Sequence, residues 1–241
     1  AGLALVDSAD NGRWRQTVID EDNFASRGFH ALLLAWLGDA TAARAEIESV
    51  LAFCARDARD TSWMHAFRVD LAWIAGDTLD VLHHARLAVH RAEQSGSDYF
   101  RAIGGRAMAL ALCMSGRAPE AVTVMEALTP ITAPGGLAHH FEANHLATLA
   151  RAYCGSGRFV EALHTAEAAI ASAQRSGSRV WEINAWLALL DLPETVLEPT
   201  RAGQGLLRLG DLLVMSGAEG FRPFWQRLAT RWAPVAEQVQ A

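Results

Sequence analysis

The chain has 241 residues, of which 51% are hydrophobic and 20% are charged, and its formal net charge at pH 7 is −6. An acidic chain lacks the basic surface that sequence-independent nucleic-acid binding requires, so we expect no nucleic-acid partner. The longest uncharged apolar runs, at 31–37 and 107–114, are much shorter than the roughly 20 residues of a membrane-spanning helix. We therefore expect no membrane partner either.

The cysteine content bears on the compartment. There are three cysteines, and no pair has the Cys-x-x-Cys spacing of a metal or redox site. The chain does not begin with a basic segment followed by an apolar stretch, as a secretory signal does. A reducing cytoplasm is the expected location.

A glycine that is soon followed by a small residue recurs along the chain at intervals of 38, 40 and 41 residues, at Gly38, Gly76, Gly116 and Gly157. This interval is typical of arrays of two-helix units. The sequence predicts helices before these glycines at 24–37, 62–75, 98–115 and 137–156, and after them at 40–56, 79–94, 119–128 and 160–175. A further helix at 180–192 and two closing helices at 206–215 and 221–232 complete the prediction, in which strands are absent.

The boundaries of these helices carry local signals. Ser62, Asp98 and Ser178 are the predicted N-caps. The joint at 129–136 contains two prolines and two glycines and is the longest, so a bend in the array is expected there.

Small residues recur where the two helices of each unit should cross. They are Ala31, Val69, Ala109 and Ala150 on the first helices, and Ala43, Val81, Ala121 and Ala162 on the second. The fourth unit has the fullest pattern, with Leu146, Leu149, Ala150 and Tyr153 before the glycine turn and Ala162, Ala166 and Ala169 after it. This pattern resembles a tetratricopeptide repeat in which Leu replaces Trp, Ala replaces Gly and the aromatic residue, and the last Pro is missing.

The expected fold is therefore all-α, a tetratricopeptide-repeat-like right-handed α-solenoid of antiparallel helix pairs. We expect one domain over 1–241, with repeats at about 20–192 and closing helices at about 194–238.

Several segments also resemble the C-terminal repeat region of bacterial class III adenylate/guanylate cyclase–ATPase signalling proteins, or of the related maltose-activator-type regulators. They are Asp20 to Phe24, Ala31 to Gly38, Ala42 to Arg44, Ala150 to Tyr153, Gly157-Arg158, Glu161 to Leu163, Ala171 to Gly177 and Trp181-Glu182. The resemblance implies a non-catalytic regulatory or protein-interaction module of a larger bacterial signalling protein. A phosphate-binding Gly-x-x-x-x-Gly-Lys-Ser/Thr loop is excluded, because the chain contains no lysine.

The sequence shows no catalytic constellation, and we expect no cofactor and no metal. The nearest approach to a metal motif is His139-His140-Phe141-Glu142 with His145, which lacks the His-Glu-x-x-His spacing. These histidines are expected at a surface or groove edge. His83, His84 and His90 are expected to be solvated or half-packed. Cys113 and Cys154 occupy equivalent places in neighbouring units, about 10 Å apart, which is too far for a disulfide.

In repeats of this kind, positions two, five, nine and twelve of the first helices line the concave face. The predicted partner-binding residues are Trp63, Asp70, Trp73, Arg106, Asn144 and Arg151. Aromatic anchors with a few charges are typical of a surface that binds a peptide or a partner domain, and Arg106 and Arg151 are expected to be exposed to a carboxylate.

Structural roles for the same residues stay open. The two tryptophans could fill a narrow superhelix, and Asp70 could pair with Arg106 or Arg68. The alternative function is small-effector sensing in a transcriptional regulator. Catalysis by an enzyme is the third and least favoured function.

Overall fold

The computed structural model describes residues 24–54 and 57–239. Within these residues it contains eleven α-helices, two short 3-10 helices and no strand, so the prediction of an all-α fold is confirmed. The helices are α2 (Phe24–Trp36), α3 (Ala40–Phe53), α4 (Ala58–Ala75), α5 (Val81–Ser95), α6 (Asp98–Met114), α7 (Ala118–Thr132), η1 (His139–Phe141), α8 (Glu142–Gly155), α9 (Phe159–Ser176), α10 (Arg179–Leu190), α11 (Pro199–Ser216), η2 (Glu219–Phe221) and α12 (Arg222–Val239). Asp20 to Asn23, Arg56 and both ends of the predicted domain lie outside the described residues.

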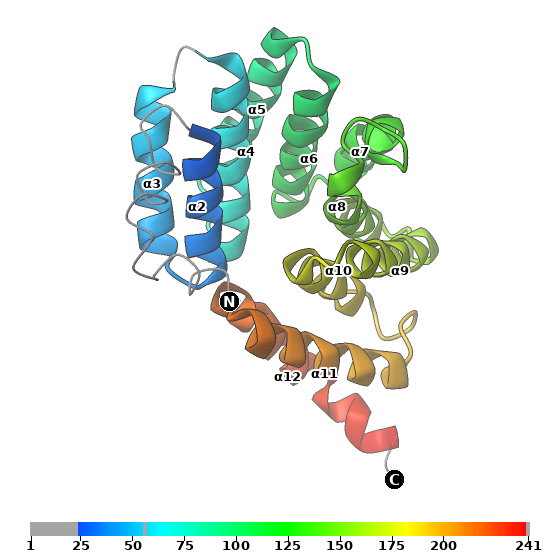
Figure 1. Ribbon diagram of the computed structural model, residues 1–241. Helices are drawn as coiled ribbons and strands as arrows, with labels where there is room; N and C mark the ends of the chain where they lie inside the picture. Colours follow the sequence, from blue (N-terminus) through cyan, green and yellow to red (C-terminus); the bar gives the residue numbers. More distant parts are fainter. Residues whose placement is uncertain (1–23, 55–56, 240–241) are drawn as a thin grey trace.

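Consecutive helices pack against each other along the whole series (Figure 1). The even-numbered helices α2, α4, α6, α8 and α10 also form a continuous row, because each contacts the next even-numbered helix. The α4 helix, the second in this row, contacts α2, α3, α5 and α6. Side chains on nearly all its faces are therefore buried.

The predicted glycine turns are confirmed. Gly38, Gly76, Gly116 and Gly157 have φ values of +97°, +68°, +72° and +75°, a conformation that glycine adopts without steric cost. Aspartates begin two of the helices: Asp39 accepts a hydrogen bond from the Ala42 amide, and Asp57 accepts from the amides of Arg59 and Asp60.

Two of the three predicted N-caps are wrong. The residue before α6 is Ser97 and not Asp98, and α4 begins at Ala58, so Ser62 lies inside this helix. The Ser62 hydroxyl donates to the Ala88 carbonyl of α5 at 2.9 Å, which fastens two helices together. Only Ser178 holds its predicted place, before α10.

Several helix ends also differ from prediction. The α8 helix begins at Glu142, after η1, and not at 137, and α12 continues beyond 232 to Val239. The α3 helix stops at Phe53. The α7 helix continues through Pro130 to Thr132, although a proline inside a helix removes one backbone hydrogen bond. The α11 helix begins at Pro199, well before the predicted 206, because proline suits a first helical turn.

The predicted joint at 129–136 lies partly in α7, which ends at Thr132, and the loop that follows covers 133–138. In Figure 1, helices α2 to α6 run along nearly one direction, whereas α9 and α10 lie across it.

The small residues predicted at the helix crossings are all buried. Ala31, Ala43, Val69, Val81, Ala109, Ala121, Ala150 and Ala162 are each at most 2% exposed. Small side chains allow neighbouring helices to approach closely. Gly104 of α6 extends this pattern, since a methyl group there would lie 3.0 Å from the Ala88 carbonyl oxygen.

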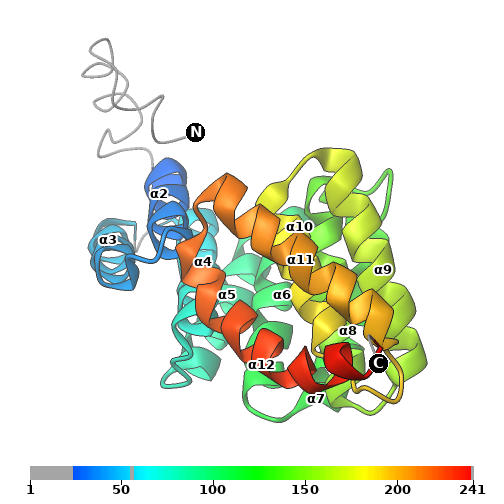
Figure 2. The ribbon, with the colours of Figure 1, turned by 90° about the horizontal axis from the view of Figure 1, so that it is seen from below.

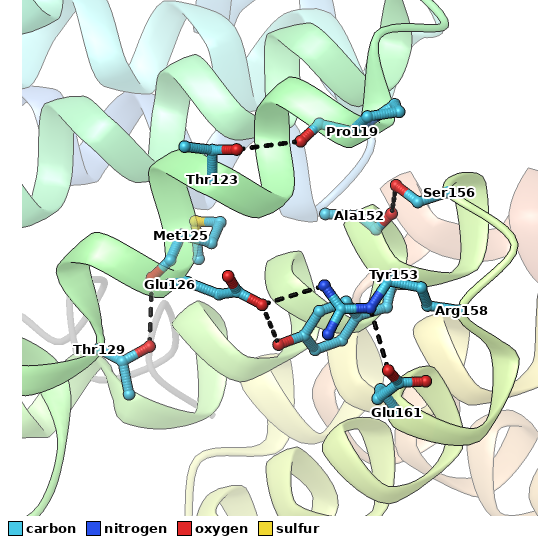
Figure 3. A network of polar contacts seen from close by, with 10 residues as sticks. All are labelled: Pro119, Thr123, Met125, Glu126, Thr129, Ala152, Tyr153, Ser156, Arg158 and Glu161. Carbon is cyan, nitrogen blue, oxygen red and sulfur yellow. Dashed lines mark hydrogen bonds and ion pairs between the residues drawn. The ribbon is translucent and has the colours of Figure 1, made fainter.

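A polar network joins the third and fourth helix pairs at the Gly157 turn (Figure 3). The Tyr153 hydroxyl donates to Glu126 at 2.9 Å, and the Arg158 guanidinium lies 4.3 Å from the Tyr153 ring centroid. Arg158 also bridges Glu126 of α7 and Glu161 of α9. Burial, followed by the hydrogen bond to Glu126, raises the pKa of Tyr153.

The C-terminal part of the chain returns to its beginning. Figure 2 shows α11 and α12 lying across one end of the preceding helices, and η2 contacts both α2 and α4. Phe221 of η2 is fully buried, with its ring centroid 5.9 Å from that of Trp73. Gly220 packs directly against the Ala35 carbonyl at the end of α2, where a side chain would not fit. This contact closes the row of helices on itself.

None of the helices described is both long enough and apolar enough to span a bilayer.

Candidate functional site

A cavity of about 70 Å³ lies within the helix row, lined by residues of α2, α4, α6, α7, η1, α8, α10 and η2. Five of the six predicted partner-binding residues line it: Trp63, Asp70, Trp73, Arg106 and Asn144. They come from three consecutive even-numbered helices, so the repeat register brings them together. Arg151, the sixth, is not among the lining residues.

Asp70 and Arg106 form an ion pair across the α4–α6 contact. Arg106 Nη2 donates to Asp70 Oδ2 at 2.6 Å, and the two side chains are 16% (Asp70) and 9% (Arg106) exposed. The pairing raised from the sequence as an alternative is therefore confirmed. The expectation that Arg106 is an exposed charge, open to an incoming carboxylate, is wrong, because this guanidinium is buried and already has a partner.

Arg151 is also held within the protein. Its guanidinium lies 4.7 Å from the centroid of the Trp73 ring and donates to the Asn184 carbonyl at 2.9 Å. Burial lowers the pKa of Arg151 to about 10, although the Asp191 carboxylate opposes this shift. Trp73 packs in turn against Phe221 and Phe224, at centroid distances of 5.9 and 5.0 Å. At this end of the cavity the tryptophan fills space, as the alternative interpretation proposed.

Trp63 belongs to a chain of aromatic side chains near the beginnings of the even-numbered helices. We call this chain the aromatic collar; it consists of Phe29, Trp63, Tyr99, Phe141 and Trp181. Successive ring centroids are 5.2, 6.1, 5.9 and 5.6 Å apart, distances typical of favourable aromatic pairs. Phe29 is 37% exposed and the other four are partly buried, so the collar presents aromatic surface to solvent.

The sequence did not single out Asn184, which lines the same cavity. Its Nδ2 donates to Asn144 Oδ1 at 2.6 Å, which joins α10 to α8. The two asparagines are 40 residues apart, which is one repeat interval, so counting the period onward from Asn144 could have found Asn184.

His145 also lines the cavity and is only 2% exposed, which overturns the expectation of a surface or groove-edge side chain. Burial lowers the pKa of His145 to about 4, and the nearby Arg106 charge acts in the same direction, while the Met125 carbonyl opposes it. The imidazole is therefore neutral near pH 7. His139 and His140 are exposed, as expected.

The cavity contains unusual polar chemistry. Across the described residues, the buried side-chain nitrogen and oxygen atoms without a well-aligned hydrogen-bond partner are Trp63 Nε1, both ring nitrogens of His145, and Asn184 Oδ1, although the Met125 carbonyl lies near the His145 ring. All three residues line this one cavity. Buried polar atoms are nearly always paired in folded proteins, so their concentration here distinguishes the cavity from ordinary core.

A second, more open depression adjoins the cavity. It has a volume of about 370 Å³ and shares Trp36, Val180 and Trp181 with the cavity wall. Its other lining residues lie at the start of α10 and the end of α11.

Other chemistry-bearing groups lie elsewhere. Cys54, Cys113 and Cys154 are free, as predicted for the last two. Within the described part of the chain, no group of three or more His, Cys, Asp or Glu side chains is arranged to hold a metal ion. His65 and His84 form a pair away from the cavity, with their Nδ1 atoms 3.1 Å apart.

Comparison of the chain with protein-family models, curated proteins and solved structures finds no match to any of them.

Proposed function

We propose that this chain is a non-catalytic regulatory or protein-interaction module of a larger bacterial signalling protein, located in the cytoplasm. In this proposal the helix pairs form a tetratricopeptide-repeat-like right-handed α-solenoid, and a peptide or partner domain binds the concave face. The observation that carries the proposal is the meeting of five sequence-predicted residues from three helix pairs around one cavity.

The binding surface would differ from the one expected from the sequence. Arg106 and Arg151 are committed to intramolecular contacts, so they would support the surface and not meet the ligand's charge. The contact area would come from the aromatic collar, which includes Trp63. Partly exposed aromatic side chains on a rigid helical frame are typical of binding hot spots.

The size of the cavity favours a peptide over a compact effector. Pockets for drug-sized molecules usually measure about 300–1,000 Å³, whereas the cavity has about 70 Å³. This space suits one side chain of a bound segment, while the rest of the segment would lie across the collar.

The test is capture of the parent protein's other domains by the immobilised full chain, with a melting curve for each variant. We expect Phe29→Ala to weaken capture at least fivefold with little change in stability, because its ring is partly exposed in the collar. Leu207→Ala is the matched control, since Leu207 is exposed on α11 and does not line the cavity. Equal capture by both folded variants would remove the collar from the site.

Small-effector sensing is the second candidate, and the unpartnered polar atoms around the cavity favour it. An effector of ordinary size would require the cavity to widen. A thermal shift caused by a small metabolite alone, without any protein partner, would favour this function over the first.

A further inference from the structure

Two side chains that line the central cavity carry polar atoms that no other part of the described chain satisfies, Trp63 Nε1 and Asn184 Oδ1. They come from α4 and α10, so the unpaired atoms cannot be a local defect of one helix. Asn184 is 8% exposed, which leaves bulk water little access to it. His145 also lines the cavity, but the Met125 carbonyl is a polar neighbour of its ring. The hydrogen-bonding capacity of Trp63 and Asn184 is available to a guest molecule in the cavity.

We propose that the central cavity binds a neutral carboxamide group. The group belongs either to a free small amide or to a glutamine or asparagine side chain of a bound peptide. This inference rests on the proposed recognition function and gives its ligand a chemical class.

The charges around the cavity favour a neutral guest. The ionisable side chains that line it are Asp70, Arg106 and His145. Asp70 and Arg106 neutralise each other at 2.6 Å, and the imidazole is uncharged near pH 7. A charged ligand would lose its hydration and find no free counter-charge among these groups, which is costly in a buried site.

The polar atoms favour a guest that both donates and accepts. The Trp63 indole can only donate. Asn184 uses its Nδ2 for Asn144, so its Oδ1 is an acceptor without a donor in the described part of the protein. A carboxamide carries a donor and an acceptor side by side, and it therefore complements the Asn184 oxygen and the indole together.

Size and shape narrow the class further. The cavity has about 70 Å³, roughly half of the 150 Å³ of an engineered cavity that holds benzene. This space suits a group of a few heavy atoms and excludes a complete heteroaromatic ring. Flat aromatic side chains, including Trp63, Phe67 and Phe141, form much of the wall, and a planar group can lie against them. The neighbouring depression shares Trp36, Val180 and Trp181 with the cavity wall.

The test is a titration of the full chain, labelled with ¹⁵N, in which the Trp63 indole N–H signal is followed. Acetamide is the probe. Acetone has nearly the same size but no donor, and acetate has nearly the same shape but a charge. We expect saturable shifts with acetamide, at least tenfold weaker binding of acetone, and no saturable binding of acetate.

Two variants locate the group. Asn184→Leu should weaken acetamide binding at least tenfold, as followed by the indole signal. Trp63→Phe keeps an aromatic ring but removes the N–H, and it should weaken binding similarly when followed by the Asn184 side-chain amide. Ser62→Ala is the control, because Ser62 is buried in the same helix as Trp63 but bonds to Ala88 away from the cavity.

The tripeptides Gly-Gln-Gly and Gly-Leu-Gly, both with free carboxyl termini, distinguish the two sources of the amide. Binding of the glutamine peptide at least tenfold tighter than acetamide assigns the group to a peptide. Saturable acetamide binding without this gain assigns it to a free small amide. Linear shifts that are equal for the three small probes, or acetamide binding that both cavity variants leave unchanged, would overturn the proposal and leave only water in the cavity.

Failure here and failure of the proposed function give different patterns. Domain capture that depends on Phe29, together with no amide binding, keeps the module and removes the amide site. Amide binding without any domain capture keeps the amide site and removes the protein-interaction module.

Discussion

The contact between Gly220 and the end of α2 permits a direct test of how the two ends of the chain are held together. A methyl group added to Gly220 would lie well under 3.0 Å from the Ala35 carbonyl oxygen and 3.1 Å from the Trp36 carbonyl oxygen. A rotamer change cannot relieve the contact, because both atoms belong to the backbone. Gly220→Ala must therefore displace η2 from α2.

We expect Gly220→Ala to lower the free energy of unfolding by about 1–3 kcal/mol, the usual cost of extra volume in a packed contact. The upper half of this range is expected, because η2 also carries the fully buried Phe221 ring that packs on Trp73. Urea unfolding of the full chain measures the loss. Hydrogen exchange should locate it, with protection lost in α2 and η2 and kept in α8 and α9.

Gly203→Ala is the matched control. Gly203 lies inside α11, and a methyl group there has no atom within 4 Å to meet. Alanine favours helix over glycine, so this change should stabilise the protein by about 0.5–1 kcal/mol. If Gly220→Ala unfolds at the same urea concentration as the unchanged chain, η2 does not hold α2 in solution and the closure is refuted.

Three further outcomes follow from the cavity and the helix crossings. The folded-state pKa of His145, about 4, is below its ordinary value of 6.5. The contribution of the neutral imidazole to the free energy of unfolding is therefore complete above pH 6.5, and it is lost as the pH falls toward 4, by up to about 3 kcal/mol. A His145→Leu variant whose stability falls as steeply with acid as that of the unchanged chain would contradict this. Arg106→Ala leaves the Asp70 carboxylate buried without its partner and should lower the free energy of unfolding by about 3 kcal/mol. A double variant with Asp70→Leu should restore most of this stability. Thermal unfolding of both variants measures the effect, and an unchanged melting temperature of Arg106→Ala would argue against a buried pair. Ala162→Leu should cost about 1–3 kcal/mol in the same measurement because it adds volume at the α8–α9 contact, and an unchanged melting temperature would show that the assumed repeat register is wrong.

The parts of the fold that sequence could predict are those decided by local chemistry. The glycine turns were predictable because a left-handed residue is required between two closely packed helices, and glycine adopts that conformation at least cost. The buried crossings were predictable because only small side chains permit close approach. The N-cap of α4 was missed because Ser62 competes as a cap on local grounds, whereas its actual role depends on the Ala88 carbonyl of another helix.

The candidate site was predictable only as far as the repeat interval extended. Counting from the turn glycines placed Trp63, Asp70 and Asn144 on one face, and all three line the cavity. The counting ended at Gly157, because the next helix pair lacks its glycine. Asn184 was missed for this reason. His145 gave no periodic signal at all. Its burial results from helices that pack around it, and a run of histidines in sequence resembles an exposed patch.

No periodic feature marks the return of Phe221 and Gly220 to α2, because this contact joins nearly opposite ends of the described chain. Arrays of helix pairs ordinarily gain or lose whole units during evolution, since each unit contacts only its neighbours. Here an inserted pair would carry η2 away from Ala35, and a deleted pair would drive the two ends into each other. The closure therefore fixes the number of units. Variation in related chains should fall in loops and surface side chains, and circular permutation at the exposed Pro134-Gly135 turn after α7 should be better tolerated than any change in the count of helix pairs.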